Sequence, residues 1–111
     1  MSGFFTKIVG VSFQNEDGSS RQELIEKMKR DFSSKTIVLR LERQHSNPHD
    51  ANAVAVNTPK GKQLGFLSKK VSETIAPILD DGKPVTATVS SITGGWPMHL
   101  GMNIKLEFEA A

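Results

Sequence analysis

The segment from residue 102 to residue 109 constrains the fold more than any other part of the chain. Every second residue in it is apolar, namely Met102, Ile104, Leu106 and Phe108, and the other residues are polar. Side chains that alternate with a period of two belong to a β-strand with one buried face and one solvated face. The segment therefore predicts a half-buried strand.

Other segments favour strands through β-branched and aromatic residues or through the same alternation. The expected strands are residues 4–13, 36–42, 53–56, 62–67 and 85–92. Ser20 and Glu23 form a capping box at the start of one short helix, and Ser68 can cap a second. Six strands and two short helices in one unit predict a mainly β fold, a compact barrel whose closure removes the exposed edges of a sheet.

Two further features mark where elements end. Pro77 lacks an N–H group and is expected to shorten or bend the second helix, which should stop at Asp80-Asp81-Gly82. Residues 93–99 contain Gly94, Gly95 and the only tryptophan, Trp96, so we expect a loop there.

Length and composition limit the class of protein. The 111 residues are expected to form a single domain, residues 1–111, with one hydrophobic core. The absence of cysteine excludes disulfides, thiolate metal sites and a cysteine nucleophile. No apolar stretch approaches the roughly 18 residues that span a bilayer and no secretion signal is evident, so we expect a soluble, cytoplasmic protein without a membrane partner or a cofactor. The net charge of +2 does not by itself indicate a nucleic-acid ligand.

A constrained turn, Asn47-Pro48-His49-Asp50, precedes the apolar strand of residues 53–56. Pro48 fixes its own φ angle, and an Asn before Pro favours an extended, turn-initiating backbone. Asp50 can fold its carboxylate onto nearby N–H groups or leave it facing outward. Such a turn holds its polar side chains still, as a binding site requires.

The same region gives little support for catalysis. His45, His49 and Asp50 are possible metal ligands, but Pro48 holds a turn rather than a helix, so a plain surface turn is the simpler interpretation. No Gly-x-Ser-x-Gly motif marks a nucleophile, and the paired carboxylates at 80–81 are explained by a helix stop. We therefore expect a binding protein rather than an enzyme.

Nucleic-acid binding has better support from the residue types. Single strands are held by flat side chains that stack on bases and by cations that follow the phosphates. Phe13, His49 and Trp96 could stack, while Lys69 and Lys70 begin a helix whose N–H groups also attract phosphate. Phe13 could equally belong to the core, and the lysines could be an ordinary solvated helix end.

Three blocks of the chain, in order, resemble the HIRAN domain family. They are Ile8-Val9-Gly10-Val11-Ser12-Phe13, Asn47-Pro48-His49-Asp50 with the strand after it, and Gly61-Lys62-Gln63-Leu64-Gly65-Phe66-Leu67. The ordered set is more specific than the Asn-Pro-x-Asp string alone, and the resemblance covers nearly the whole chain. It implies a small OB-like or SH3-like six-stranded barrel that binds the 3′ end of single-stranded DNA. The chain is similar to the standalone form found in bacteria and phages.

The resemblance also implies roles for individual residues. The terminal base would stack between Phe13 and His49, and Asp50 would accept a hydrogen bond from the terminal 3′-hydroxyl. A carboxylate accepts from a hydroxyl but repels a phosphodiester, so such a site prefers a strand end to an interior nucleotide. Asn47 would shape the turn, and backbone groups near Phe66 would line the pocket wall.

The resemblance also implies that Lys69 would contact a backbone phosphate. The chain departs from the DNA-binding members of the family at other positions. Ser12 stands where those members have Arg, and Phe13 and His49 stand where they have Tyr; Phe66 occupies a position that can be polar. The loss of Arg removes a phosphate partner and His stacks less well than Tyr. Weaker binding is expected, and a different ligand stays open.

The leading hypothesis is a non-enzymatic module for single-stranded DNA with a free 3′-hydroxyl end, acting in DNA repair with a helicase or nuclease as a possible partner. The alternative is a protein-interaction module that uses exposed strand edges and Trp96, with a purely structural Asn-Pro-His-Asp turn. The sequence decides neither between DNA and RNA nor on the oligomeric state.

Overall fold

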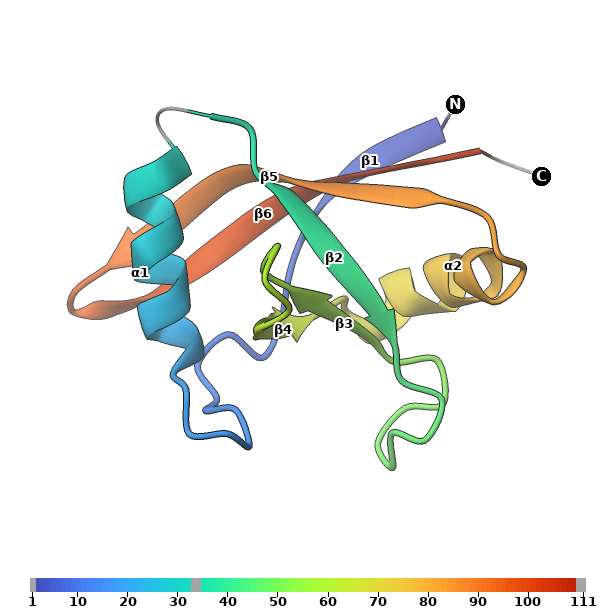
Figure 1. Ribbon diagram of the computed structural model, residues 1–111, viewed down its shortest axis with the longest axis horizontal. Helices are drawn as coiled ribbons and strands as arrows, with labels where there is room; N and C mark the ends of the chain where they lie inside the picture. The colour runs from blue at the N-terminus through green and yellow to red at the C-terminus, as the bar shows by residue number, and fades with distance from the viewer. Residues whose placement is uncertain (1, 33–34, 110–111) are drawn as a thin grey trace.

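Six strands and two helices follow one another in the computed structural model, which describes residues 2–32 and 35–109. In chain order they are β1 (Ser2–Lys7), α1 (Arg21–Phe32), β2 (Val38–Arg43), β3 (Val54–Asn57), β4 (Gln63–Phe66), α2 (Lys69–Asp80), β5 (Val85–Gly95) and β6 (Met98–Phe108). The strands pair antiparallel in the order β1-β6-β5-β2-β3-β4 and form one curled sheet (Figure 1). The predicted mainly β fold with two helices is confirmed.

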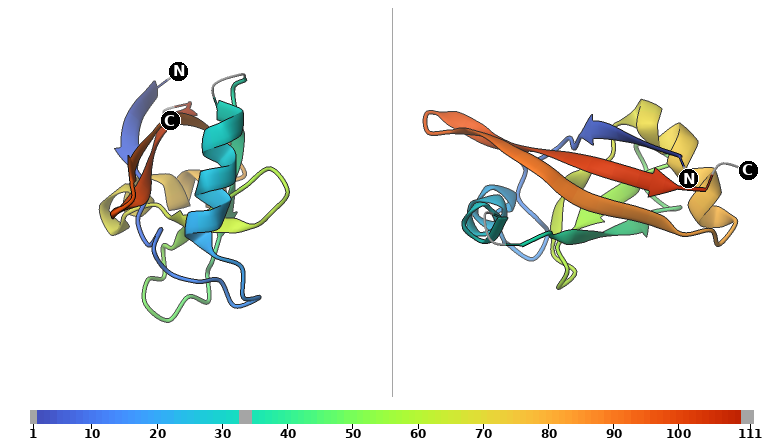
Figure 2. Two further views of the ribbon diagram at one scale, coloured as in Figure 1. Left: turned by 90° about the vertical axis from the view of Figure 1, so that its left-hand side faces the viewer. Right: turned by 90° about the horizontal axis from the view of Figure 1, so that it is seen from above.

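A single pair of residues joins the two ends of the curled sheet. Beyond β1 the chain reaches β4, where the Val9 N–H donates to the Phe66 carbonyl (2.8 Å) and the Phe66 N–H donates to the Val9 carbonyl (2.9 Å). Gly65 permits this approach, because a Cβ on it would collide with the backbone oxygen of Val9. The curl visible in Figure 2 is thereby closed into a small barrel.

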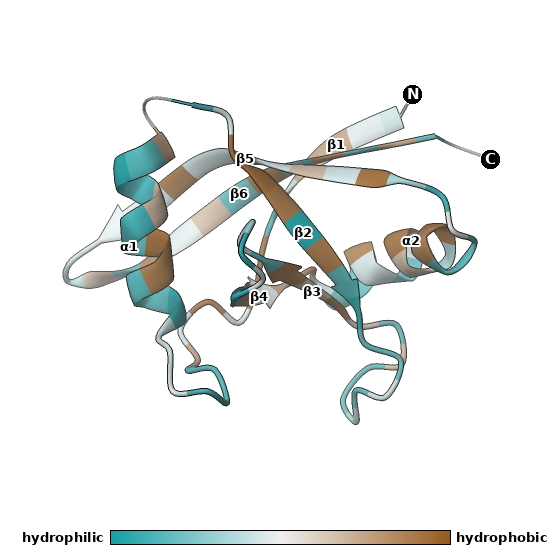
Figure 3. Ribbon diagram, viewed as in Figure 1, coloured by the Kyte–Doolittle hydropathy of each residue, from teal (hydrophilic) through white to brown (hydrophobic). Residues whose placement is uncertain are grey.

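Buried apolar residues of both helices and of strands β2 to β6 form one hydrophobic core, and Figure 3 colours apolar residues brown. The alternation in β6 is confirmed, since Met102, Ile104, Leu106 and Phe108 are all at most 9% exposed. The two helices lie at opposite ends of the molecule in Figures 1 and 2, where α1 contacts β4, β5 and β6 while α2 contacts β2, β3 and β5. The core is therefore enclosed by the sheet and by one helix at each end.

The helix starts follow the predicted caps. The Ser20 hydroxyl accepts from the Glu23 N–H (3.2 Å), and the Ser68 hydroxyl accepts from the Val71 N–H (3.3 Å). The α2 helix continues through Pro77 and reaches its predicted end, so the expected shortening is wrong. Neither helix in the described residues has the length and hydropathy that a bilayer-spanning segment needs.

The first strand is shorter than predicted. β1 ends at Lys7, whereas the sequence favoured a strand through Phe13. Gly10 adopts a φ of 73°, which ends the extended conformation, and the Phe13 N–H then bonds to the Gly10 carbonyl (3.4 Å). Phe13 consequently lies in a turn rather than at the end of a strand.

The last hairpin is longer than predicted. Instead of a loop over residues 93–99, β5 and β6 continue until only Trp96 and Pro97 separate them, and Gly95 pairs with Met98. Gly94 and Gly95 have φ angles of 80° and 136°, conformations that favour glycine and let the chain reverse within a few residues. Trp96 therefore stands at the tip of a long hairpin.

Candidate nucleic-acid interface

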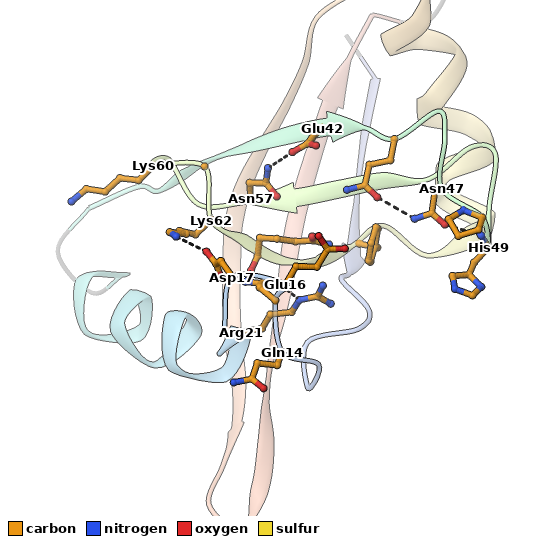
Figure 4. A pocket seen from close by; sticks show the side chains of 16 residues that line it. Gln14, Glu16, Asp17, Arg21, Glu42, Asn47, His49, Asn57, Lys60 and Lys62 are labelled. Carbon is orange, nitrogen blue, oxygen red and sulfur yellow. Dashed lines mark hydrogen bonds and ion pairs between the residues drawn. The ribbon is translucent and has the colours of Figure 1, made fainter. Parts of the chain in front are cut away.

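A cavity of about 620 Å³ opens where three connecting segments meet (Figure 4). These segments are residues 14–17 before α1, the loop after β2, and the turn between β3 and β4. Most lining residues are polar, and the charged ones are Arg21, Lys60, Lys62, Glu16, Asp17 and Glu42. Since cations and carboxylates are equal in number, binding has to depend on individual groups rather than on a general positive field.

The Asn-Pro-His-Asp turn forms one side of the cavity and is held by its own side chains. Asn47 Oδ1 accepts from the His49 N–H (2.8 Å), and Asn47 Nδ2 donates to Gln44 Oε1 (3.1 Å). Asp50 Oδ1 accepts from the Asn52 N–H (2.9 Å). The bonds that Asn47 Oδ1 and Asp50 Oδ1 accept from the N–H two residues later are Asx turns, in which a side-chain oxygen replaces a backbone acceptor. The rigidity expected from the sequence thus has a hydrogen-bond basis.

The base of this loop is fastened to the end of α2. The Arg43 guanidinium makes two hydrogen bonds to Asp80, at 3.1 and 3.2 Å, and His45 Nε2 lies 2.9 Å from Asp80 Oδ1. Partial burial opposes ionisation of Asp80, but the bonds from Arg43 and His45 outweigh it and lower the pKa of this carboxyl. Asp80 therefore anchors the loop as well as ending the helix.

The opposite side of the cavity brings an aromatic pair close to a cation. A Cβ placed on Gly10 would lie 3.7 Å from ring carbons of both Phe13 and Phe66, and 3.3 Å from Nη1 of Arg21. The Arg21 guanidinium carbon lies 5.6 Å from the centre of the Phe66 ring. Phe13 is 67% exposed, so it does not belong to the core. Its ring is available for stacking at the border of the cavity.

The structure brings some of the predicted site residues together. Asn47, His49 and Phe66 line the cavity; Phe13 is not a lining residue, but it lies near Gly10, close to Phe66 and Arg21. Asp50 is not among the lining residues; it is half-buried, and one of its oxygens is engaged in the Asx turn.

Three other predicted residues lie outside the cavity. Lys69 and Lys70 are exposed in the first turn of α2, which follows β4 directly. Trp96 is 97% exposed at the tip of the β5–β6 hairpin, which extends toward the left of Figure 1 beside α1. These residues do not form one pocket with His49.

Sequence reasoning missed the residues of the 14–21 segment. Arg21 is only 8% exposed, and it donates from Nε to Asn15 Oδ1 (2.8 Å) and from Nη1 to the Gly10 carbonyl (2.7 Å). Asn15 Nδ2 in turn donates to the Gln63 carbonyl (2.9 Å), so the segment is tied to β4. Burial lowers the pKa of Arg21. The sequence signal for Arg21 was a cation at the first position of a helix, where the helix dipole favours acidic side chains and a cation calls for an explanation.

Two other contacts shape the wall around the β3–β4 turn. Lys62 pairs with Asp17 (2.5 Å), and this bond, together with those from Ser19, holds the pKa of Asp17 well below its usual range. Asn57 is 6% exposed; its Nδ2 donates to Glu42 Oε1 (2.9 Å), whereas its Oδ1 is buried without a partner among the described residues. The wall therefore holds one unsatisfied acceptor.

The possible metal ligands named in the sequence analysis, His45, His49 and Asp50, do not come together in one site. His45 pairs with Asp80, while His49 lines the cavity and Asp50 bonds to the backbone. In residues 2–32 and 35–109, no group of three or more His, Cys, Asp or Glu side chains is placed to hold a metal ion.

Comparisons with known proteins agree with this fold. The HIRAN domain family matches residues 2–109, so the chain belongs to the HIRAN domain family. The helicase-like transcription factors of Oryctolagus cuniculus and Homo sapiens are each 42% identical to it over 41 residues, which is 37% of this chain. The matched part is 4% of the length of these relatives.

Two solved structures have the same fold. The HIRAN domain of human HLTF superposes with a TM-score of 0.65 and 21% identity, covering 96% of this chain and 74% of that chain. A protein from Lactobacillus plantarum superposes with a TM-score of 0.62 and 17% identity, covering 96% of this chain and 99% of that chain. Membership of the family makes this domain a binding module and supports nucleic-acid binding as its class of function.

Proposed function

We propose that this domain binds single-stranded DNA at a free 3′-hydroxyl end. The observation that carries the proposal is the exposed ring of Phe13 close to Phe66, which lines a polar cavity together with His49. The terminal base would stack on Phe13 and His49, and each stacked base contributes about 1–3 kcal/mol. Asn47 and Phe66 would form the wall, and Lys69 and Lys70 would contact phosphates farther along the strand.

Asp50 would distinguish a 3′-hydroxyl from a 3′-phosphate. Its Oδ1 already accepts from the Asn52 N–H, so its second oxygen is the one that would accept from the hydroxyl. A phosphate in the same place would meet a negative charge. A domain with this preference would act on strand ends, in DNA repair in the cytoplasm, together with a helicase or nuclease.

Fluorescence anisotropy with oligonucleotides ending in a 3′-hydroxyl or a 3′-phosphate tests this proposal. We expect the wild-type protein to prefer the hydroxyl by about tenfold, because a hydrogen bond to a charged group is lost and a repulsion is gained. Asp50→Asn keeps the acceptor that holds the Asx turn but removes the charge, so it should lose the preference. Asp81→Asn, an exposed carboxylate after α2, is the matched control. Equal affinity of the wild-type protein for both ends would refute end recognition.

A second candidate function rests on the β5–β6 hairpin. Trp96 and Met98 are 97% and 71% exposed, and neither lines the cavity. Exposed apolar side chains of this size favour contact with a protein partner. If this is the main function, Trp96→Ala will abolish capture of a protein in a pull-down, and single-stranded DNA will not bind to the wild-type domain.

A further inference from the structure

Arg21 occupies a position that is unfavourable for an ordinary structural arginine. It is 8% exposed, and it is the first residue of α1, where the helix dipole disfavours a cation. The carboxylates that line the same cavity, at 16, 17 and 42, make no ion pair with it, and no other carboxylate in the described residues does. A cation with so little exposure is costly without an anion, and the Phe66 ring is its aromatic partner, so an anionic ligand in the cavity would add the charge partner that the described residues do not supply.

The guanidinium also keeps hydrogen-bond donors available. Arginine has five N–H groups, and the acceptors found for them in the described residues are Asn15 Oδ1 and the Gly10 carbonyl. Both acceptors are neutral, and both lie on the side of the 10–15 segment, which fixes the plane of the guanidinium. Figure 4 shows Arg21 among the side chains that surround the cavity. The remaining donors have no acceptor among the described residues and are not buried, so they are open to a ligand that enters the cavity.

A second, independent observation also indicates an incomplete site. Asn57, on another wall of the cavity, is 6% exposed, and its Oδ1 is buried without a partner in the part of the chain that the structure describes. The bond from Nδ2 to Glu42 fixes the orientation of the amide, so the oxygen cannot exchange places with the nitrogen without loss of that bond. Donors of Arg21 that are open to solvent and a buried acceptor of Asn57 without a partner thus lie around one cavity.

We propose that Arg21 binds a phosphate of the DNA strand, namely the phosphate of the nucleotide whose base stacks on Phe13. Arg21 Nη1 and the Phe13 ring converge on Gly10, so a phosphate at the guanidinium belongs to the nucleotide at that ring. A guanidinium presents parallel donors that match phosphate oxygens. This inference rests on the proposed function, and it assigns to α1 the phosphate contact that Ser12 cannot make.

The first test needs no DNA. The Nε–H resonance of Arg21 in a ¹⁵N-labelled protein is followed while inorganic phosphate is added, with chloride at matched ionic strength as the reference. We expect a saturable shift with phosphate and none with chloride. Arg21→Lys should retain weaker phosphate binding, detected by competition or calorimetry, because it keeps the charge but loses the planar pair of donors. Absence of a saturable shift in the wild-type protein would overturn the anion site.

The second test varies one linkage of the ligand. Two oligonucleotides with a 3′-hydroxyl are compared, one with a normal phosphodiester before the last nucleotide and one with a neutral methylphosphonate there. The wild-type protein should bind the phosphodiester about tenfold more tightly, and Arg21→Gln should bind both equally. Lys83→Gln, an exposed lysine outside the cavity, should preserve the wild-type preference.

The outcomes separate this inference from the proposed function. If Arg21→Gln weakens both ligands by one factor and keeps the preference, Arg21 only supports the fold and the inference fails, although DNA binding stands. If no oligonucleotide binds while inorganic phosphate still titrates Arg21, the anion site is supported and the proposed function fails. Thermal unfolding of Arg21→Gln shows whether the variant is folded; if it is not, Arg21→Lys is measured with the same pair of ligands.

Discussion

Two exposed aromatic side chains of the described residues, Phe13 and Trp96, differ in what surrounds them. Phe13 lies close to Phe66 and the buried Arg21, which line the same cavity as a turn held by Asx hydrogen bonds. Trp96 is more exposed, at 97% against 67%, but it stands at a hairpin tip away from the cavity. An exposed ring indicates a binding site when fixed polar groups converge beside it, and exposure alone does not.

The strongest test of this comparison changes a glycine in each region. In Gly65→Ala the new Cβ would collide with the Val9 carbonyl, so barrel closure should weaken by about 1–3 kcal/mol and DNA affinity should fall with it. Gly94 has a φ of 80°, and a Cβ on it would collide with the His99 backbone. Gly94→Ala should therefore lower the free energy of unfolding of the hairpin by about 1–2 kcal/mol without loss of DNA affinity. Denaturant unfolding and anisotropy measure the two effects. Equal loss of affinity in both variants would mean that the regions are not independent.

Removal of each aromatic ring tests the comparison directly. Phe13→Ala should weaken binding of single-stranded DNA about tenfold or more, because a stacking surface is lost. Trp96→Ala should change affinity less than twofold. Both side chains are exposed, so thermal unfolding temperatures should change little. The reverse order of affinities, measured by anisotropy, would move the binding site to the hairpin.

Substitution of Lys69, with Lys83 as a control, tests how far the binding surface extends from the cavity. Lys69→Gln should lower affinity for 3′-hydroxyl and 3′-phosphate ligands alike and reduce the slope of log K against log salt by about 0.7, the value for one contact to a single strand. Lys83→Gln, an exposed lysine beyond the other end of α2, should leave the slope unchanged. Identical slopes for Lys69→Gln and the wild type would confine the surface to the cavity.

The smallest expected effect concerns the anchor of the Asn47–Asp50 loop. The pKa of Asp80 is lowered below its ordinary value of 3.8 in the folded state. Its contribution to stability is therefore present above about pH 4 and is lost as the pH falls through the folded pKa. Asp80→Asn should flatten the fall in unfolding free energy on acidification, and Asp81→Asn should not. If both variants show the wild-type pH profile, the Arg43 contact contributes nothing measurable.

Much of the fold followed from local pattern. The alternation in β6 identified the buried face, and Ser20 and Ser68 marked both helix starts. These signals are local, because caps and side-chain periodicity act within a few residues. The end of β1 was predicted wrongly because its pairing with β6 stops at Lys7 and Val9 pairs instead with distant Phe66, a contact that no local pattern reveals.

The part of the candidate site that lies in the Asn-Pro-His-Asp turn was predictable, and the part that lies where α1 meets the preceding loop was missed. Asn47 and His49 line the cavity as expected because the turn defines its own geometry. Arg21 was missed because its burial depends on Asn15 and the Gly10 carbonyl, which lie before the helix. Asp80 was interpreted as a helix stop, since its partner Arg43 is 37 residues away in the chain.

In residues 2–32 and 35–109 the ends of the sheet are joined by the pair Val9 and Phe66, and this has a consequence for how such domains can diverge. The next strand of the sheet follows α1, and the 14–19 segment lies outside the sheet, with its own isolated bridge between Gln14 and Ser20. Insertions or deletions there would change the depth and charge of the rim at a small entropic cost that grows slowly with loop length. Relatives with the same core and strand pairing can in this way bind different ligands.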